Sequence, residues 1–146
     1  MQAKSCLILK NYIVKNINFS INENFQFNQN VTIKINPEFR REIKKIDNNN
    51  AAVNLFFCIK NEKDDLPFSM EVNIEGQFHL ENWEQPDLIS LIVSNSIAIL
   101  FPYLRSIISM ITANANISPY MLPVMNIAAL FEQDENDDLD KKNIND

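Results

Sequence analysis

The chain has 146 residues, a formal net charge of −6, one glycine, one histidine and two cysteines. A chain of this length forms a single domain that buries about 70% of its unfolded surface. A lone glycine excludes the glycine-rich loops that bind phosphate. His79, Cys6 and Cys58 are too few for a cysteine–histidine zinc site. We therefore expect a protein without metal, cofactor or enzyme activity.

The charge is unevenly distributed along the chain. Residues 1–60 carry nine Lys or Arg and four Asp or Glu. Residues 61–131 carry two Lys or Arg and eight Asp or Glu. Residues 132–146 carry two Lys, seven Asp or Glu and no aromatic residue. Such a segment cannot bury enough apolar surface to fold, so we expect a domain over 1–131 and a disordered acidic tail over 132–146. The acidic total disfavours nucleic acid as a partner.

The sequence predicts a cytoplasmic protein. The apolar run Cys6–Leu9 is shorter than the core of a cleavable signal, and two cysteines do not form a disulfide framework. Leu88–Ile111 is long enough to span a membrane, but it contains Pro102, Arg105 and several serines. An arginine in mid-segment adds about 2.5 kcal/mol or more to the free energy of insertion. We expect a buried helix here and not a membrane span.

The first half of the chain has the pattern of strands. A long strand is expected over Cys6–Phe19, which is rich in Ile, Val, Tyr and Phe. Apolar residues alternate with polar ones over Val31–Asn36, Val53–Ile59 and Phe68–Leu80. Gly76 lies on the apolar face of the last of these, which predicts a bulge or a close backbone approach there.

Between the second and third of these strands, residues 36–50 are expected to form a polar connection. This segment contains four basic residues close together, namely Arg40, Arg41, Lys44 and Lys45. We interpret them as the basic face of a solvated loop in preference to an anion-binding site.

The second half of the chain changes to a helical period. Pro86 and Asp87 are typical of a helix start, and the segment from Leu88 onward is apolar over most of its circumference. Pro102 is expected to kink this long helix, and a short second helix is expected over Val124–Phe131. Strands followed by helices predict the α+β class, with helices on one face of a four-stranded antiparallel sheet.

Some apolar residues have no obvious place in so thin a domain. Phe56 and Cys58 lie on the second face of their strand, and Phe25 and Phe27 lie in a connection. The long helix carries more apolar surface than one sheet can cover. This surplus predicts an oligomer interface, a binding groove or both, and we assign the helix to a subunit interface.

Several segments resemble one known family. Tyr12 with Lys15–Phe19 is similar to a first strand of the form Y-x-K-D-I-S-F. Ile99–Arg105 reads ILFPYLR and Leu122–Phe131 reads LPVMNIAALF, similar to signatures of the form ILFPYAR and LAPVNFDALF. In this order and spacing, with Met70–Val72 in the fourth strand, they resemble the SecB family of protein-export chaperones.

The resemblance implies a homotetramer, a dimer of dimers with the long helices packed between sheets. It also implies an ATP-independent holdase that binds unfolded polypeptides, preproteins for export among them, in exposed apolar grooves. Phenylalanine and methionine suit such a groove because they adapt to many partners. The residues that we assign to this client-binding groove are Phe25, Phe27, Phe56, Phe68, Leu122, Met125, Ile127, Leu130 and Phe131.

The chain departs from the family where export chaperones contact the SecA motor. The matching positions are Asn16, Ser20, Ser69 and Glu71, of which only Glu71 is acidic. A less acidic face weakens the electrostatic steering of such a contact. The alternative is a SecB-like chaperone dedicated to the antitoxin of a toxin–antitoxin system.

Two hypotheses from other classes remain open. A structural adaptor subunit would cover its surplus apolar surface with one fixed partner. An enzyme would need His79 together with Glu71, Glu75 or Glu81, which share the polar face of the strand Phe68–Leu80. We interpret these four residues as a solvated strand face.

Overall fold

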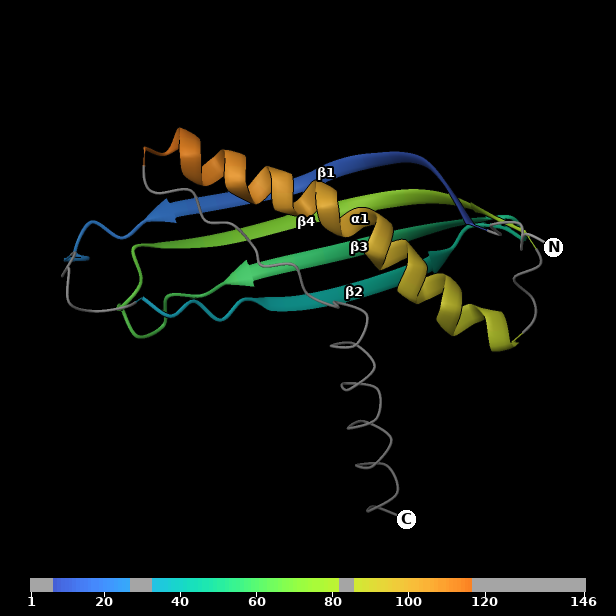
Figure 1. The fold of residues 1–146 in the computed structure, drawn as a ribbon, viewed down its shortest axis with the longest axis horizontal. Helices are drawn as coiled ribbons and strands as arrows, with labels where there is room; N and C mark the ends of the chain where they lie inside the picture. Colours follow the sequence, from blue (N-terminus) through green and yellow to red (C-terminus); the bar gives the residue numbers. More distant parts are fainter. Residues whose placement is uncertain (1–6, 27–32, 82–85, 117–146) are drawn as a thin grey trace, which may run out of the picture.

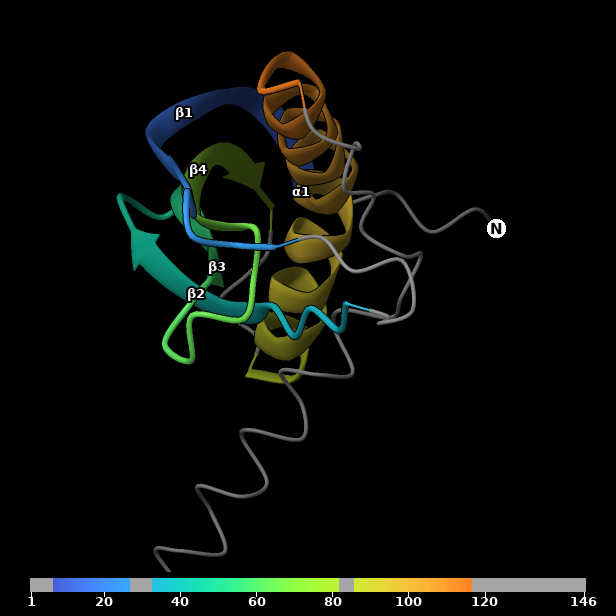
Figure 2. The ribbon, with the colours of Figure 1, turned by 90° about the vertical axis from the view of Figure 1, so that its left-hand side faces the viewer.

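A computed structural model describes residues 7–26, 33–81 and 86–116, with the backbone alone for 86–93. Within these ranges the chain forms β1 (Leu7–Ile21), β2 (Glu38–Lys45), β3 (Asn50–Ile59), β4 (Phe68–Leu80) and α1 (Pro86–Asn114), in that order. The strands make one antiparallel sheet in the order β1-β4-β3-β2, so β1 and β2 are its edges. The helix crosses one face of the sheet diagonally (Figure 1), and the view in Figure 2 shows that both ends of α1 lie on that face. The predicted α+β class is confirmed.

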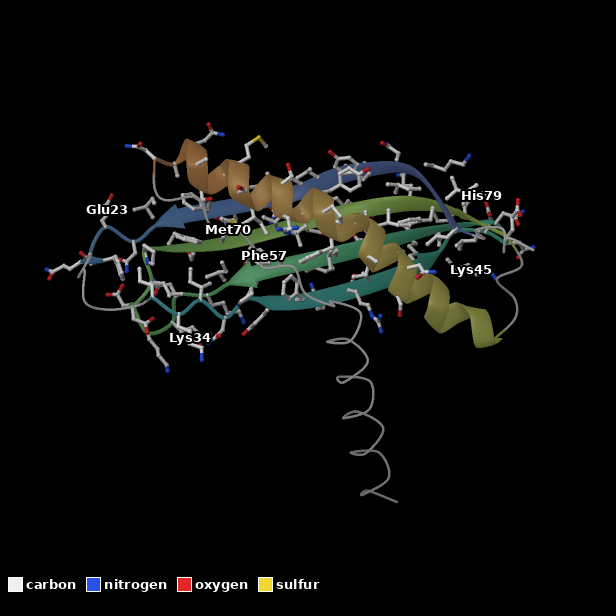
Figure 3. The ribbon with its side chains drawn as sticks, in the orientation of Figure 1. Glu23, Lys34, Lys45, Phe57, Met70 and His79 are labelled. Carbon is white, nitrogen blue, oxygen red and sulfur yellow. The ribbon has the colours of Figure 1, made fainter. Side chains whose placement is uncertain are left out.

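The hydrophobic core lies between α1 and the sheet. The alternate residues of β3 and β4 that face the helix are buried, and Figure 3 labels Phe57 and Met70 among them. From α1, four residues at spacings of three and four are fully buried, as expected for one face of a helix: Ile97, Leu100, Leu104 and Ile108. We call this face of the sheet the helix face and the opposite one the open face.

The helix continues through Pro102, whose side chain is exposed. By length and composition alone, Ser94–Asn114 would pass as a membrane span, with a mean hydropathy of 1.5. The core helix of a soluble protein passes the same test, so one such helix is weak evidence. Here its inward residues pack on the sheet, which agrees with the expected buried helix.

The second strand lies later in the chain than predicted. Residues 33–37 form no strand, and β2 falls inside the segment that was expected to be a connection. The prediction was wrong because an edge strand can carry many charged residues. In such a strand the charges hide the alternation of apolar and polar residues. Phe39 faces inward against Phe57, with ring centroids 5.6 Å apart. The basic cluster therefore lies on an edge strand and not in a loop.

At Gly76 the structure confirms a close approach of the backbone and not a bulge. A Cβ at this position would overlap the side chains of Phe78 and Leu100, so the backbone does approach the helix closely. The irregularities in the ladder lie instead on the partner strand, where the register shifts between Leu9 and Asn11 and again between Val14 and Asn16.

Candidate interaction surfaces

An exposed apolar strip follows the edge strand β1 on the helix face. It consists of Tyr12, Val14, Ile17 and Ile21 from β1 with Tyr103 and Met110 from α1. Ile17 is 48% exposed and Met110 56% exposed, which is unusual for large apolar residues beside a core. Tyr12 and Tyr103 stack with ring centroids 4.5 Å apart, so strand and helix form one surface.

The two register shifts explain how β1 builds this strip. Each shift inserts one extra residue, Lys10 or Lys15, between residues that pair with β4. An insertion reverses which face the following residues occupy. As a result, every residue of β1 that pairs with a helix-face position of β4 is apolar: Leu7, Leu9, Tyr12, Val14, Ile17, Phe19 and Ile21. A strict two-residue alternation would have turned Asn11 and Lys15 inward.

A network of hydrogen bonds holds the loop that carries Phe25. The backbone N–H of Asn22 donates to the Pro67 carbonyl at 2.9 Å, and its Nδ2 donates to Asp64 Oδ1 at 2.7 Å and to the Leu66 carbonyl at 2.9 Å. The Phe25 N–H then donates to the Asn22 carbonyl at 3.2 Å. These contacts tie the residues after β1 to the residues before β4.

Of the residues assigned to the client groove, the structure brings Phe25 and Phe68 to this end of the sheet. Phe68 pairs with Ile21 and is only 3% exposed, with Phe19 5.7 Å away between ring centroids. Phe25 is half-buried. Phe56 lies apart from them on the open face. The remaining groove residues lie outside the described residues: Phe27, Leu122, Met125, Ile127, Leu130 and Phe131.

The open face carries a shallow hollow of about 460 Å³ over β2, β3 and β4. Its floor includes Phe56, whose ring lies 4.1 Å from the Arg40 guanidinium carbon. Burial, with the negative charge of Glu71 as a second cause, raises the pKa of the Cys58 thiol in this hollow, so the thiol stays protonated and weakly reactive. The surplus residues Phe56 and Cys58 thus occupy the second face of β3, as predicted.

The four positions that match the SecA contact also share the open face. Asn16 pairs with Asn73, Ser20 pairs with Ser69, and Glu71 lies between them on β4. Nearby, Lys15 Nζ donates to Glu75 Oε2 at 3.0 Å, which neutralises a second carboxylate on this face. The structure therefore assembles these positions into one patch, and the patch is nearly neutral.

The structure separates His79 from Glu71 and Glu75, two of the three carboxylates that an enzyme centre was expected to use. His79, Glu71 and Glu75 do share the open face of β4, as predicted. His79 and Glu75 are separated along the strand by about 13 Å, beyond the reach of a proton transfer. Glu75 is held by Lys15 and by Asn54, whose Nδ2 donates to it at 3.1 Å. In the described residues no group of three or more potential metal ligands occurs.

Comparison with known proteins identifies the family. Residues 1–138 match the SecB family, described as preprotein translocase subunit SecB. The chain belongs to this family. It is 34% identical over 131 residues to an uncharacterized protein of Methanocaldococcus jannaschii, a match that covers 88% of this chain and 84% of that one. It is 28% identical to the protein-export protein SecB of Bartonella quintana over 109 residues, 74% of this chain and 64% of the relative.

The fold is also found among solved structures. A SecB-like chaperone of Mycobacterium tuberculosis, solved with a peptide of the HigA1 antitoxin, superimposes with a TM-score of 0.65 at 11% identity over 82% of this chain and 90% of that one. A protein of unknown function from Streptococcus agalactiae superimposes with a TM-score of 0.50 at 17% identity, covering 81% and 97%. At these identities the likeness concerns the fold, and it confirms the SecB-like architecture.

Proposed function

We propose that this protein is an ATP-independent holdase chaperone that binds unfolded polypeptides through exposed apolar surface. Membership of the SecB family supports this proposal. The observation that carries it is the partly accessible ring of Phe25 at one end of the sheet, in a loop held by the hydrogen bonds of Asn22. Large flexible or aromatic side chains bind many sequences because they need no fixed pattern of hydrogen bonds.

In this proposal the groove begins at the end of the sheet that holds Phe25 and Phe68. Phe27 and the segment Leu122–Phe131 complete it. Phe25 is half-buried in a loop held by Asn22, so its ring is positioned in advance and partly accessible. Phe68 belongs to the core at the same end of the sheet.

The exposed apolar strip along β1 and α1 supports assembly into a homotetramer. The edge strand β1 has a neighbour on one side only, and its 15 residues extend over about 50 Å. Pairing of β1 with β1 of a second copy would continue the sheet and cover Ile8 and Ile13 on the open face as well as Ile17 on the helix face. Two such dimers would then pack through their helices, where Tyr103 and Met110 are exposed.

The test is suppression of aggregation of a chemically unfolded protein in the absence of nucleotide. Phe25→Ala should weaken client binding several-fold, whereas Phe56→Ala removes an equal ring from the open face and should leave it within twofold. Equal losses in both variants would extend the groove to Phe56. Absence of any binding to unfolded polypeptides at micromolar concentration would overturn the holdase proposal, and one fixed stoichiometric partner would favour an adaptor subunit.

A second candidate function is that of a chaperone dedicated to an antitoxin. The nearly neutral patch around Asn16, Ser20 and Ser69 favours it over delivery to SecA, because little electrostatic attraction remains for a basic partner. The fold likeness to a chaperone solved with an antitoxin peptide agrees with this choice. Binding assays against the SecA C-terminal segment and against an antitoxin encoded next to this gene would separate the two. Tight binding of the SecA segment alone would restore the export role.

A further inference from the structure

The turn that leads into β4 contains a residue in a strained backbone conformation. Asp64 has a φ of 54°, in the left-handed region that residues other than glycine rarely adopt. Aspartate and asparagine tolerate this region because their short side chains can form hydrogen bonds nearby. Strain of this kind persists where surrounding contacts fix the conformation. The hydrogen bonds of Asp64 therefore indicate the role of this conformation.

The side chain of Asp64 holds the segment that follows β1. Its Oδ1 accepts a hydrogen bond of 2.7 Å from Asn22 Nδ2, a residue 42 positions away in the sequence. The same nitrogen donates to the Leu66 carbonyl at 2.9 Å. These two acceptors fix the orientation of the Asn22 amide, so that its Oδ1 accepts a hydrogen bond of 3.1 Å from the Asn24 N–H.

Asn61 fixes the turn from which Asp64 projects. Its Oδ1 accepts a hydrogen bond of 3.0 Å from the Leu66 N–H, and its Nδ2 donates to the Leu66 carbonyl at 3.2 Å. The Asp64 N–H in turn donates to the Asn61 carbonyl at 3.4 Å. Leu66 is buried and belongs to the core cluster, so the turn is anchored in the core. Asp64 is therefore presented to Asn22 by a fixed frame.

We propose that Asp64 and Asn22 are positioning residues of the client groove, and that their hydrogen bond sets the place of Phe25. The connection is short, because the Phe25 N–H donates to the Asn22 carbonyl at 3.2 Å. Figure 3 labels Glu23, in the same loop, at the end of the sheet where β1 ends and β4 begins. The effect on clients rests on the proposed function, whereas the positioning of the loop does not.

The hydrogen bond affects affinity through the population of one loop conformation. A client that binds only when Phe25 is in place has an apparent Kd equal to the intrinsic Kd divided by the fraction of molecules in that conformation. Loss of a hydrogen bond to an exposed carboxylate changes such a conformational equilibrium by about threefold to tenfold. Asp64 therefore tunes client affinity from outside the groove, by ordering the loop in advance.

The first test measures amide hydrogen exchange of Asn24 and Phe25 by NMR in the full chain without client. Asp64→Gly keeps the left-handed conformation accessible and removes the acceptor, so both amides should exchange about three to ten times faster than in the wild type. Asp64→Asn keeps the conformation and an acceptor oxygen, and it should recover most of the protection. Asp65→Ala is the matched control, because it removes an exposed carboxylate from the next residue of the turn. Unchanged exchange in Asp64→Gly would overturn the inference.

The second test measures the Kd for reduced and carboxymethylated α-lactalbumin, which remains unfolded, at one fixed protein concentration. Asp64→Gly should weaken binding at least threefold, and Asp64→Asn should recover most of the loss. In a Phe25→Ala background, Asp64→Gly should have no further effect, because the ring that it positions is absent.

The possible outcomes of the binding test separate the two proposals. Equal affinity of Asp64→Gly and the wild type, or the same loss with and without the Phe25 ring, would overturn the positioning role. Absence of binding by the wild type would overturn the holdase proposal instead, and the exchange of the Phe25 amide would still decide whether Asp64 positions the loop.

Discussion

Gly76 shows how a single side chain would disturb the contact between helix and sheet. A Cβ there would lie 2.5 Å from Phe78 Cε2 and 2.8 Å from Leu100 Cδ2. Both neighbours are almost completely buried, so neither can move without disturbing the core. Glycine is required here by space and not by backbone conformation, since its φ is not positive.

Gly76→Ala should therefore lower the free energy of unfolding by about 1–3 kcal/mol, the usual cost of overpacking a core. Urea denaturation at one fixed protein concentration measures this change. Gln77→Ala, the next residue on the open face of the same strand, is the matched control and should cost less. Wild-type stability of Gly76→Ala would mean that α1 lies farther from β4 than described.

Glu75 introduces a small dependence of stability on pH. Burial raises its pKa, but hydrogen bonds from Lys15 and Asn54 outweigh burial, and the pKa lies below the ordinary value of 4.5. A lowered pKa in the folded state stabilises the protein above pH 4.5, and this contribution is lost as the pH falls further. Lys15 is half exposed, which limits the contribution to about 0.5 kcal/mol.

Glu75→Gln should accordingly reduce the free energy of unfolding at pH 7 by about 0.5 kcal/mol and by less at pH 3.5. Urea titrations at the two pH values measure the difference. Ser69→Ala changes the same face of β4 without removing an ionisable group, and it should shift both values equally. An equal loss at both pH values for Glu75→Gln would show that packing, and not charge, explains its role.

At the scale of elements, the sequence predicts that β1 is a strand, but it does not predict the register in which β1 pairs with β4. Its composition of Ile, Val, Tyr and Phe indicates a strand, and the boundaries differ by only a few residues. The insertions at Lys10 and Lys15 become visible only when β1 is paired with β4. Because each insertion exchanges the two faces, no fixed two-residue period describes this strand.

The exposed strip on β1 predicts association. Ile17→Lys places a charge in the strip without touching the core, so the variant should remain folded and should show a lower native mass than the wild type. Native mass spectrometry or light scattering measures the mass. Ile46→Lys is the matched control, since Ile46 is 59% exposed in the turn before β3 and should keep the wild-type mass. An unchanged mass for Ile17→Lys would contradict assembly through β1.

β2 illustrates the opposite case, in which tertiary context overrides local pattern. The sequence of Val31–Asn36 alternates more cleanly than that of Glu38–Lys45, yet the described residues 33–36 form no strand and Glu38–Lys45 do. β2 gains its stability from pairing with the almost wholly buried strand β3. Such pairing depends on residues 6 to 20 positions away, which a local two-residue period does not contain.

At the scale of the whole molecule, the distribution of charge matters more than its total. The described domain combines a nearly neutral patch on β1 and β4 with a basic edge at β2, and the acidic residues concentrate in 132–146. The net charge of −6 therefore describes no single surface. Partners are selected by local charge, because screening limits its range to about 10 Å.

The sequence by itself determined the fold class, the family and the presence of surplus apolar surface. These properties depend on composition, on the order of strands before a helix, and on short motifs. All three can be recognised in the sequence without knowing which residues are in contact. Only the tertiary structure decided where that surplus lies. In the structure the second strand is Glu38–Lys45, the basic cluster lies on this edge strand, and Phe56 lies apart from Phe25. The physical reason is that strand register and edge position arise from pairing between distant residues, and a local pattern does not specify them.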